Sequence, residues 1–324
     1  MVSGESSRVA PGMGKPRAAK AGWWRSLKGN IVRHPWLYLM VLPAIVYYLI
    51  FAYAPMFGVV VAFKRFNAFT GIWDSPWVGL THFETFFNSI YFARLIRNTL
   101  LLNVYGLLVG FPAPIILALM LNEIIHPKYK RAIQTLTYLP YFISTVVVTG
   151  IIINFLSPST GIVNFVIRSV GLQAIPFLNE PGWFRHVYVW SDVWQWIGWS
   201  SIIYLAALAA IDPTLYESAS IDGAGRFAKM RFISIPGIMP VIMVILLLSL
   251  GSLMSVGFEK VYLLYNPSTY ETADVISTYV YRAGLQGGRY DFGTAVGLFN
   301  SLVALVLLVT VNWLARRFNQ QSLW

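Results

Sequence analysis

The apolar stretch from residue 186 to 211 carries one face of mixed polar and aromatic side chains. Asp192, Gln195, Trp196 and Trp199 follow the spacing i, i+3, i+4 and i+7, which aligns them on one side of a helix. Sugar rings suit such a face, because their C–H surfaces stack on aromatic rings and their hydroxyls need hydrogen-bond partners. We therefore expect a path for a polar solute here. The alternative is an interfacial belt of Trp residues, with Asp192 capping the outer end of the helix.

Side chains suited to catalysis or metal binding do not cluster in the sequence. No His has a partner at metal-ligand spacing, and no HExxH motif occurs. Residues 12–15 superficially resemble a phosphate-binding loop, but Pro16 stands where that loop needs Ser or Thr. We therefore expect no catalytic residue, no metal site and no cofactor in this chain. The four histidines are His34, His82, His126 and His186.

Residues 212–240 predict a compact helix–turn–helix. Pro213 ends or offsets the preceding apolar segment, and the polar side chain at 212 or 214 can cap a new short helix. Glu217 is expected in the first turn of that helix, where a carboxylate complements the helix dipole. Gly223 then breaks the helix, and a second short helix follows until Pro236 turns the chain. The alternative is an ordinary amphipathic loop that seals a helical bundle.

The elements around these residues are those of a membrane protein. Of 324 residues, 57% are hydrophobic and only 11% are charged, whereas a typical soluble domain is about a quarter charged. This composition excludes an ordinary soluble enzyme and a disordered regulator. Prolines such as Pro112 and Pro140 predict kinks rather than breaks. Six apolar segments can each cross roughly 30 Å of hydrocarbon: 37–63, 98–121, 133–156, 186–211, 238–257 and 293–315.

Basic residues indicate how the chain is oriented. Residues 1–34 form a polar tail with seven Lys or Arg, in which residues 23–28 predict a segment lying on the inner leaflet. An amino terminus inside places 15 of the 24 basic residues in the tail, the cytoplasmic loops and the carboxyl terminus. We therefore expect both termini in the cytoplasm. Because the net charge of +11 is explained by topology, no nucleic-acid partner is expected.

The 212–240 stretch resembles the EAA loop of binding-protein-dependent ABC importer permeases. That pattern is Glu-Ala-Ala, three residues, Gly, and then Ile-x-Leu-Pro. Ser218 and Ile235 depart from it by small changes. Residues 33–37 and 274–297 also resemble the carbohydrate branch of this family, and the permease subunits of bacterial alginate importers in particular. The matching positions are Glu217, Ala219, Asp222, Gly223, Ala224, Ile233 and Pro236.

The resemblance implies a half-transporter rather than an enzyme. The expected fold is the all-α, type I importer permease, with a tail of residues 1–34 and a six-helix domain of residues 35–324. The expected partners are a second related permease, two cytoplasmic ATPase subunits that carry ATP and Mg, and a periplasmic solute-binding protein. The cargo is an oligosaccharide, expected to be acidic, and the location is the bacterial inner membrane with its lipids. The alternative is a secondary transporter or channel for a small polar solute.

The resemblance also implies where partners and cargo bind. The EAA loop, including Arg226, is expected to contact the ATPase. The cargo path on the Asp192 face is expected to continue onto Tyr141, Thr145, Ser249 and Ser252. Asp192 shows no evident basic partner in the sequence, which makes it a poor neighbour for an acidic sugar. Small residues of the last two segments, Gly251, Gly293 and Gly297, predict close packing against a partner permease. The basic residues expected to attract an acidic cargo on the outer side are Arg185, Arg282 and Arg289.

Overall fold

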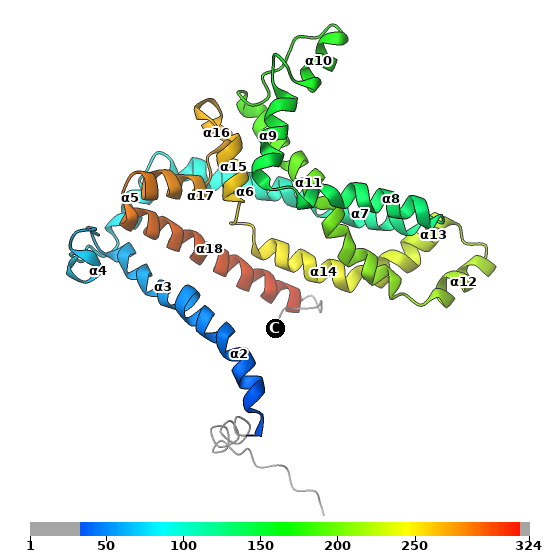
Figure 1. Cartoon of the computed structure of the whole chain (residues 1–324), viewed down its shortest axis with the longest axis horizontal. Helices are drawn as coiled ribbons and strands as arrows, with labels where there is room; N and C mark the ends of the chain where they lie inside the picture. The colour runs from blue at the N-terminus through cyan, green and yellow to red at the C-terminus, as the bar shows by residue number, and fades with distance from the viewer. Residues whose placement is uncertain (1–32, 318–324) are drawn as a thin grey trace, which may run out of the picture. The chain divides into compact units, whose positions relative to one another are not determined.

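Helices make up the part of the chain that the computed structural model describes, residues 33–317 (Figure 1). The chain divides into two compact units, the first ending at Gly58 and the second beginning at Val59. The first unit holds α2 (Pro35–Tyr48), a π-helical turn (Leu49–Tyr53) and α3 (Ala54–Met56). The predicted basic tail and its interfacial segment fall almost wholly outside the described residues and stay predictions.

The second unit is a series of helices that differ widely in length. Four 3-10 or π-helical segments that matter below are Leu139–Phe142, Met230–Ser234, Pro267–Thr269 and Val280–Gln286. The α-helices are α4 (Gly71–Asp74), α5 (Thr81–Phe87), α6 (Phe92–Gly110), α7 (Pro112–Asn122), α8 (Pro127–Tyr138), α9 (Thr145–Leu156), α10 (Ile162–Ser169), α11 (Pro181–Ala209), α12 (Pro213–Ile221), α13 (Arg226–Lys229), α14 (Ile235–Gly251), α15 (Phe258–Leu264), α16 (Tyr270–Ala273), α17 (Ile276–Tyr279) and α18 (Tyr290–Arg317).

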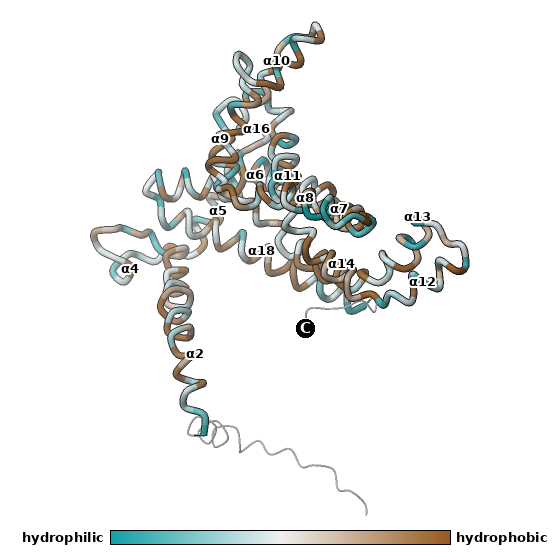
Figure 2. Tube along the Cα trace, turned by 45° about the vertical axis from the view of Figure 1, so that its right-hand side comes forward, coloured by the Kyte–Doolittle hydropathy of each residue, from teal (hydrophilic) through white to brown (hydrophobic). Residues whose placement is uncertain are grey.

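Four helical stretches are long and apolar enough to cross a bilayer, and two bent pairs bring the number to as many as six. Figure 2 shows α14, which belongs to one of the four, as strongly hydrophobic. The all-α membrane architecture expected from the sequence is therefore confirmed. The four stretches are Pro35–Phe63, Phe92–Asn122, Arg226–Gly251 and Tyr290–Trp313.

The predicted span 133–156 is a bent pair and not one kinked helix. Its two arms, Pro127–Phe142 and Thr145–Leu156, meet at 102°. Ile143 is extended there (φ −86°, ψ 131°), and the Ser144 hydroxyl accepts a hydrogen bond from the N–H of Val147, which starts α9 afresh. The sequence interpretation of Pro140 as a kink was wrong, because the capping Ser144 that follows gives the chain a new helix start.

The fifth span also differs from its prediction. Helical backbone runs without a break from Arg226 to Gly251, so Pro236 does not turn the chain back and no separate second short helix forms. Pro236 follows a π-helical turn, Met230–Ser234, at the second position of α14. A proline ring inside a regular helix crowds the carbonyl four residues earlier. The π-helical turn changes the backbone at that point, and the helix continues through the proline.

Packing in the second unit centres on α11, which contacts α6, α7, α8 and α14. Apolar clusters form on both sides of it, one with α7 and α14 and one with α6, α15 and α16. Small residues allow the closest approaches, as expected for helices in lipid. A Cβ on Gly198 would collide with the backbone carbonyl of Thr137 at the end of α8. Gly198 therefore lets α11 approach the end of α8 closely.

Two glycines predicted to face a partner permease are used within the chain instead. Gly251, at the end of α14, lies against the Leu308 side chain of α18. A Cβ on Gly293 would come within 2.8 Å of the Cα of Gly284, which joins the start of α18 to the π-helical segment before it. Only Gly297 has open space around its Cβ position.

Candidate functional site

The 212–225 stretch forms the predicted helix and turn. The Asp212 carboxylate accepts a hydrogen bond of 2.9 Å from the Thr214 N–H and caps α12, with Pro213 as the first helical residue. Helix α12 ends at Ile221, and Gly223 adopts φ +79°, a conformation that favours glycine. Glu217 is the exception, since α12 has no acidic residue in its first turn. The helix starts at Pro213, so Glu217 lies one turn further in.

Helix α12 is an exposed knob that shares few contacts with the rest of the unit. It buries none of its residues. Two hydrogen bonds hold it to the following helix, from Lys229 Nζ to Ser220 Oγ (2.6 Å) and between the hydroxyls of Tyr216 and Ser234 (3.0 Å). The other residues of the predicted contact are also at the surface: Glu217, Asp222, Arg226 and Pro236 are exposed, and Ala219 and Ala224 are half-buried.

A cavity of about 750 Å³ lies between α6, α7, α11 and α14. Of the predicted path residues, Asp192, Trp196, Ser249 and Ser252 line it. Polar lining residues that the sequence analysis missed are Asn103, Tyr188, Ser200, Tyr204 and Ser255. A repeat of the 192–196 spacing on α11 indicates Tyr188 and Ser200, but which face of α6 points inward depends on the packing.

The predicted face of α11 divides between two environments. Gln195 is buried (4% exposed), and its amide donates to the Ile143 carbonyl (3.2 Å) at the break between α8 and α9. Trp199 stacks on Tyr141, with ring centroids 4.2 Å apart and planes parallel within 1°. Trp196 touches the same Tyr141 ring edge-on while lining the cavity. Of the other predicted path residues, none lines the cavity: Gln195, Trp199, Tyr141 and Thr145.

Asp192 is neither a helix cap nor unpaired. It lies well inside α11, which begins at Pro181, so the capping alternative is wrong. The ammonium of Lys260, on α15, is 3.3 Å from its Oδ1. The sequence analysis missed this partner because the two residues are far apart in the chain and meet only when α15 folds against α9 and α11.

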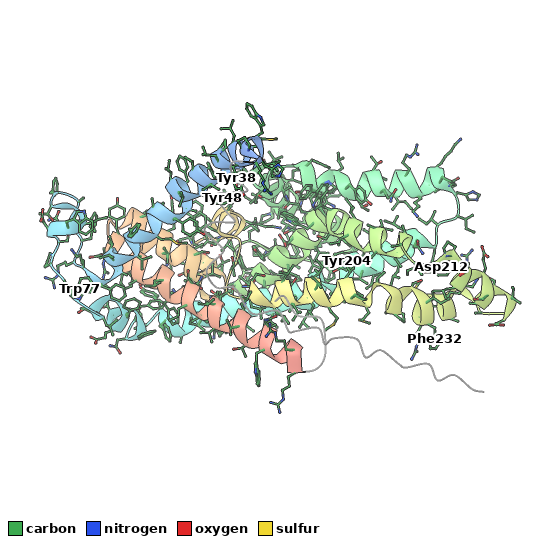
Figure 3. All side chains as sticks on the ribbon, turned by 90° about the horizontal axis from the view of Figure 1, so that it is seen from below. Tyr38, Tyr48, Trp77, Tyr204, Asp212 and Phe232 are labelled. Carbon is green, nitrogen blue, oxygen red and sulfur yellow. The ribbon has the colours of Figure 1, made fainter. Side chains whose placement is uncertain are left out.

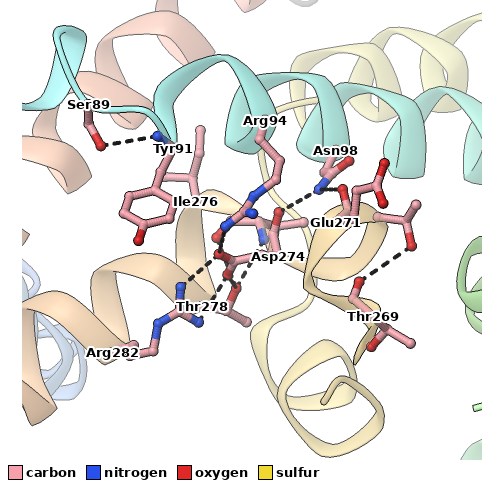
Figure 4. A network of polar contacts seen from close by, with 12 residues as sticks. Ser89, Tyr91, Arg94, Asn98, Thr269, Glu271, Asp274, Ile276, Thr278 and Arg282 are labelled. Atoms are coloured by element: carbon pink, nitrogen blue, oxygen red, sulfur yellow. Dashed lines mark hydrogen bonds and ion pairs between the residues drawn. The ribbon is translucent and has the colours of Figure 1, made fainter. Parts of the chain in front are cut away.

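Buried Asp274 organises a second polar cluster, between α16 and α17 (Figure 4), which lie well away from α12 in Figure 1. Arg282 donates to it through both terminal nitrogens, at 3.3 and 2.7 Å. Arg94 pairs with it at 3.5 Å, and the Thr278 hydroxyl donates to it at 2.9 Å. Burial lowers the pKa of Arg282, but the hydrogen bonds and charge of Asp274 outweigh this effect and raise it above its ordinary value.

The three basic residues expected to attract cargo are therefore not equivalent. Arg282 is committed to Asp274. Arg185 donates to the Asn98 side chain (2.9 Å), whose amide in turn holds the carbonyls of Glu271 and Asp274. Only Arg289 is exposed, with its guanidinium 4.4 Å from the Phe292 ring centroid. These residues were predicted to be free charges, because the burial of Asp274 among them is not evident from the sequence.

Side chains that could hold a metal do not gather in the described part of the chain. Within residues 33–317, no group of three or more His, Cys, Asp or Glu side chains is placed to bind an ion.

Comparisons with known proteins all indicate the same family. Residues 110–322 match the model of the binding-protein-dependent transport system inner membrane component. LplB of Bacillus subtilis strain 168 is 45% identical over 93% of this chain and 94% of its own. A polygalacturonan/rhamnogalacturonan transport system permease, YteP, of the same organism is 44% identical over 91% and 92%.

Solved structures agree with this result. The crystal structure of a bacterial ABC transporter that imports the acidic polysaccharide alginate contains a chain that is 50% identical, with a TM-score of 0.84. The match covers 90% of this chain and 99% of that one. A second alginate transporter structure, in complex with a periplasmic protein bound to alginate pentasaccharide, matches at 48% identity and the same TM-score, over 93% and 100%. The secondary-transporter alternative is therefore excluded, and the chain belongs to the family of binding-protein-dependent transport system inner membrane components, the permease subunits of ABC importers.

Proposed function

We propose that this permease moves an acidic oligosaccharide from the periplasm to the cytoplasm. The observation that carries the proposal is the cavity beside α11, where Trp196 and Tyr188 stand among the polar side chains of Asp192, Ser249 and Ser252. Rings and hydroxyls in one cavity suit a sugar, because its C–H faces and its hydroxyls need different partners. The names of the similar proteins, which transport polygalacturonan/rhamnogalacturonan and alginate, support an acidic cargo.

Partners would supply the energy and the delivery of the cargo. In this proposal α12 docks on one of two cytoplasmic ATPase subunits, which bind ATP and Mg, while this chain contributes no cofactor. A second related permease completes the path, and a periplasmic solute-binding protein brings the sugar to the outer side. Both termini lie in the cytoplasm of a bacterium, and α12 and the Asp274 cluster mark the inner and outer ends of the unit. The exposure of α12 and its separation from the Asp274 cluster support this arrangement.

Uptake of a labelled alginate oligosaccharide tests the cargo path. The complete importer, with its partner subunits, is placed in lipid vesicles with either Trp196→Ala or Trp194→Ala. Both substitutions remove an indole from α11, but Trp196 lines the cavity and Trp194 lies beside a separate, apolar pocket. Only Trp196→Ala removes a ring on which the sugar can stack. Uptake is therefore expected to fall several-fold in this variant alone. Equal uptake by both variants would place the path elsewhere.

A further inference from the structure

Lys260 is an uncommon residue for its position. It is 4% exposed, on a short helix, α15, that packs against α9 and α11. Its ammonium lies 3.3 Å from Asp192 Oδ1 and 5.5 Å from the Tyr188 ring centroid. A buried ammonium is costly unless it is paired. Among the described residues, Asp192 is the acidic side chain with which Lys260 pairs.

The two members of this pair face the cavity differently. The Asp192 side chain is 47% exposed and lines the cavity, whereas the Lys260 side chain is 5% exposed and does not line it. The cavity wall therefore presents the carboxylate, and the compensating positive charge lies behind it. Among the described residues that line this cavity, Asp192 alone is a Lys, Arg, His, Asp or Glu.

We propose that Lys260 determines which cargo charge the cavity accepts, by neutralising Asp192 from behind the wall. This inference rests on the proposed function and names the residue that makes an acidic cargo possible there. An unpaired carboxylate in the cavity wall repels the carboxylates of an acidic sugar bound there, because charges closer together than the Debye length are only weakly screened. The same carboxylate, once paired, remains available to accept hydrogen bonds from sugar hydroxyls.

The charge of Lys260 depends on Asp192. Burial lowers the pKa of Lys260, and the charge and hydrogen bond of Asp192 raise it. Removing Asp192 therefore removes a negative charge from the wall and also favours the neutral form of the lysine. Removing Lys260 alone leaves the wall negative. Loss of Lys260 is therefore expected to weaken binding of an acidic cargo, whereas loss of Asp192 is expected to leave it close to that of the wild type.

A set of variants with two matched sugars tests the proposal. Binding of an alginate oligosaccharide, and of the same oligosaccharide with its carboxyl groups reduced to alcohols, is measured on the detergent-solubilised importer without its binding protein. The variants are Lys260→Met, Asp192→Asn and the double substitution. Glu259→Gln is the control, because Glu259 is an exposed carboxylate beside Lys260 and its loss changes the net charge as Asp192→Asn does.

Lys260→Met is expected to weaken binding of the acidic sugar by on the order of tenfold, with little change for the reduced sugar. Adding Asp192→Asn is expected to restore acidic binding, and Glu259→Gln to leave both sugars unaffected. Equal losses for both sugars, no loss in Lys260→Met, or no rescue in the double variant would overturn the proposal. A wild-type importer that neither binds nor takes up the acidic sugar would contradict the proposed function itself, which is a separate outcome.

Discussion

The Asp274 cluster buries its carboxylate completely, whereas α12 leaves all of its residues at least partly exposed. Asp274 is 0% exposed and is satisfied by side chains from the same chain, including Arg94 and Arg282. None of the ion pairs found within residues 33–317 involves a residue of α12. The Asp274 carboxylate has all of these partners within this chain, and they join α6 to the α16–α17 segment. Helix α12 makes none of these ion pairs, and its exposed side chains remain available to a partner.

Removal of the buried carboxylate is expected to have the largest effect on this contrast. Asp274→Ala leaves Arg282 and Arg94 without their partner, and their side chains are 28% and 29% exposed. The cost is therefore expected to lie below about 3–5 kcal/mol, the cost of breaking a fully buried ion pair, but well above that of a surface substitution. Asp222→Ala, which removes an exposed carboxylate after α12, is expected to cost at most ~0.5 kcal/mol. Thermal unfolding of the detergent-solubilised chain measures both. Equal melting temperatures for the two variants would show that the cluster does not stabilise the chain.

The turn after α12 is expected to show an intermediate effect on stability and a large one on coupling. Gly223 has φ +79° with nothing within 4 Å of its Cβ position, so Gly223→Leu meets no clash but takes a strained backbone, at roughly 1–2 kcal/mol. The strain is relieved by moving α12. Stimulation of ATP hydrolysis by the loaded binding protein is expected to collapse, while the complex still assembles in the membrane.

Gly225→Leu is the matched control for that variant. Gly225 also has open space around its Cβ position, but its backbone is extended (φ −72°, ψ 171°), which any residue adopts. It is expected to retain most of the stimulation. Normal stimulation in Gly223→Leu, or the same loss in both variants, would show that the left-handed conformation of Gly223 does not control coupling.

The sequence predicted what depends on local residues and missed what depends on packing. The apolar segments, a cap at residue 212 or 214 and the turn at Gly223 were predicted, because hydropathy, capping and positive φ are local properties. The partners of Asp192 and Asp274 were not predicted. Lys260 lies 68 residues from Asp192, and Arg94 lies 180 residues from Asp274, so only the folded chain brings them together. Arg282 lies only eight residues from Asp274, but the π-helical segment that holds Arg282 is not evident in the sequence.

The predictions made from proline were wrong in two opposite ways. Pro140 predicted a kink, but Ser144 caps a new helix and the two arms meet at 102°. Pro236 predicted a turn, but it follows a π-helical turn inside a continuous helix. A proline has no backbone N–H, so one hydrogen bond of the helix is missing at that residue. The capping group or π-helical turn beside it decides whether the helix ends, and that depends on the surrounding structure.

The smallest effect is expected at the cap of α12, and it depends on pH. The backbone and side-chain hydrogen bonds from Thr214 lower the pKa of Asp212 below its ordinary value of 3.8. A carboxyl with a lowered pKa stabilises the folded state at pH values above its ordinary pKa, and this contribution is lost as the pH falls through the lowered value. Helix α12 is therefore expected to hold its cap at neutral pH and to fray at its first turn only in acid.

Hydrogen exchange of the α12 amides, corrected for intrinsic rates, measures this loss. Asp212→Ala is expected to reduce protection of the first turn at every pH. Asp212→Asn is the matched control, because Asn caps a helix about as well as Asp and does not titrate, so its protection is expected to stay constant as the pH falls. A wild-type helix whose protection does not change in acid, or an Asn variant that loses protection there, would mean that the carboxylate of Asp212 does not hold the start of α12. In that case the two hydrogen bonds to Ser220 and Ser234 would be left to position the knob against its partner.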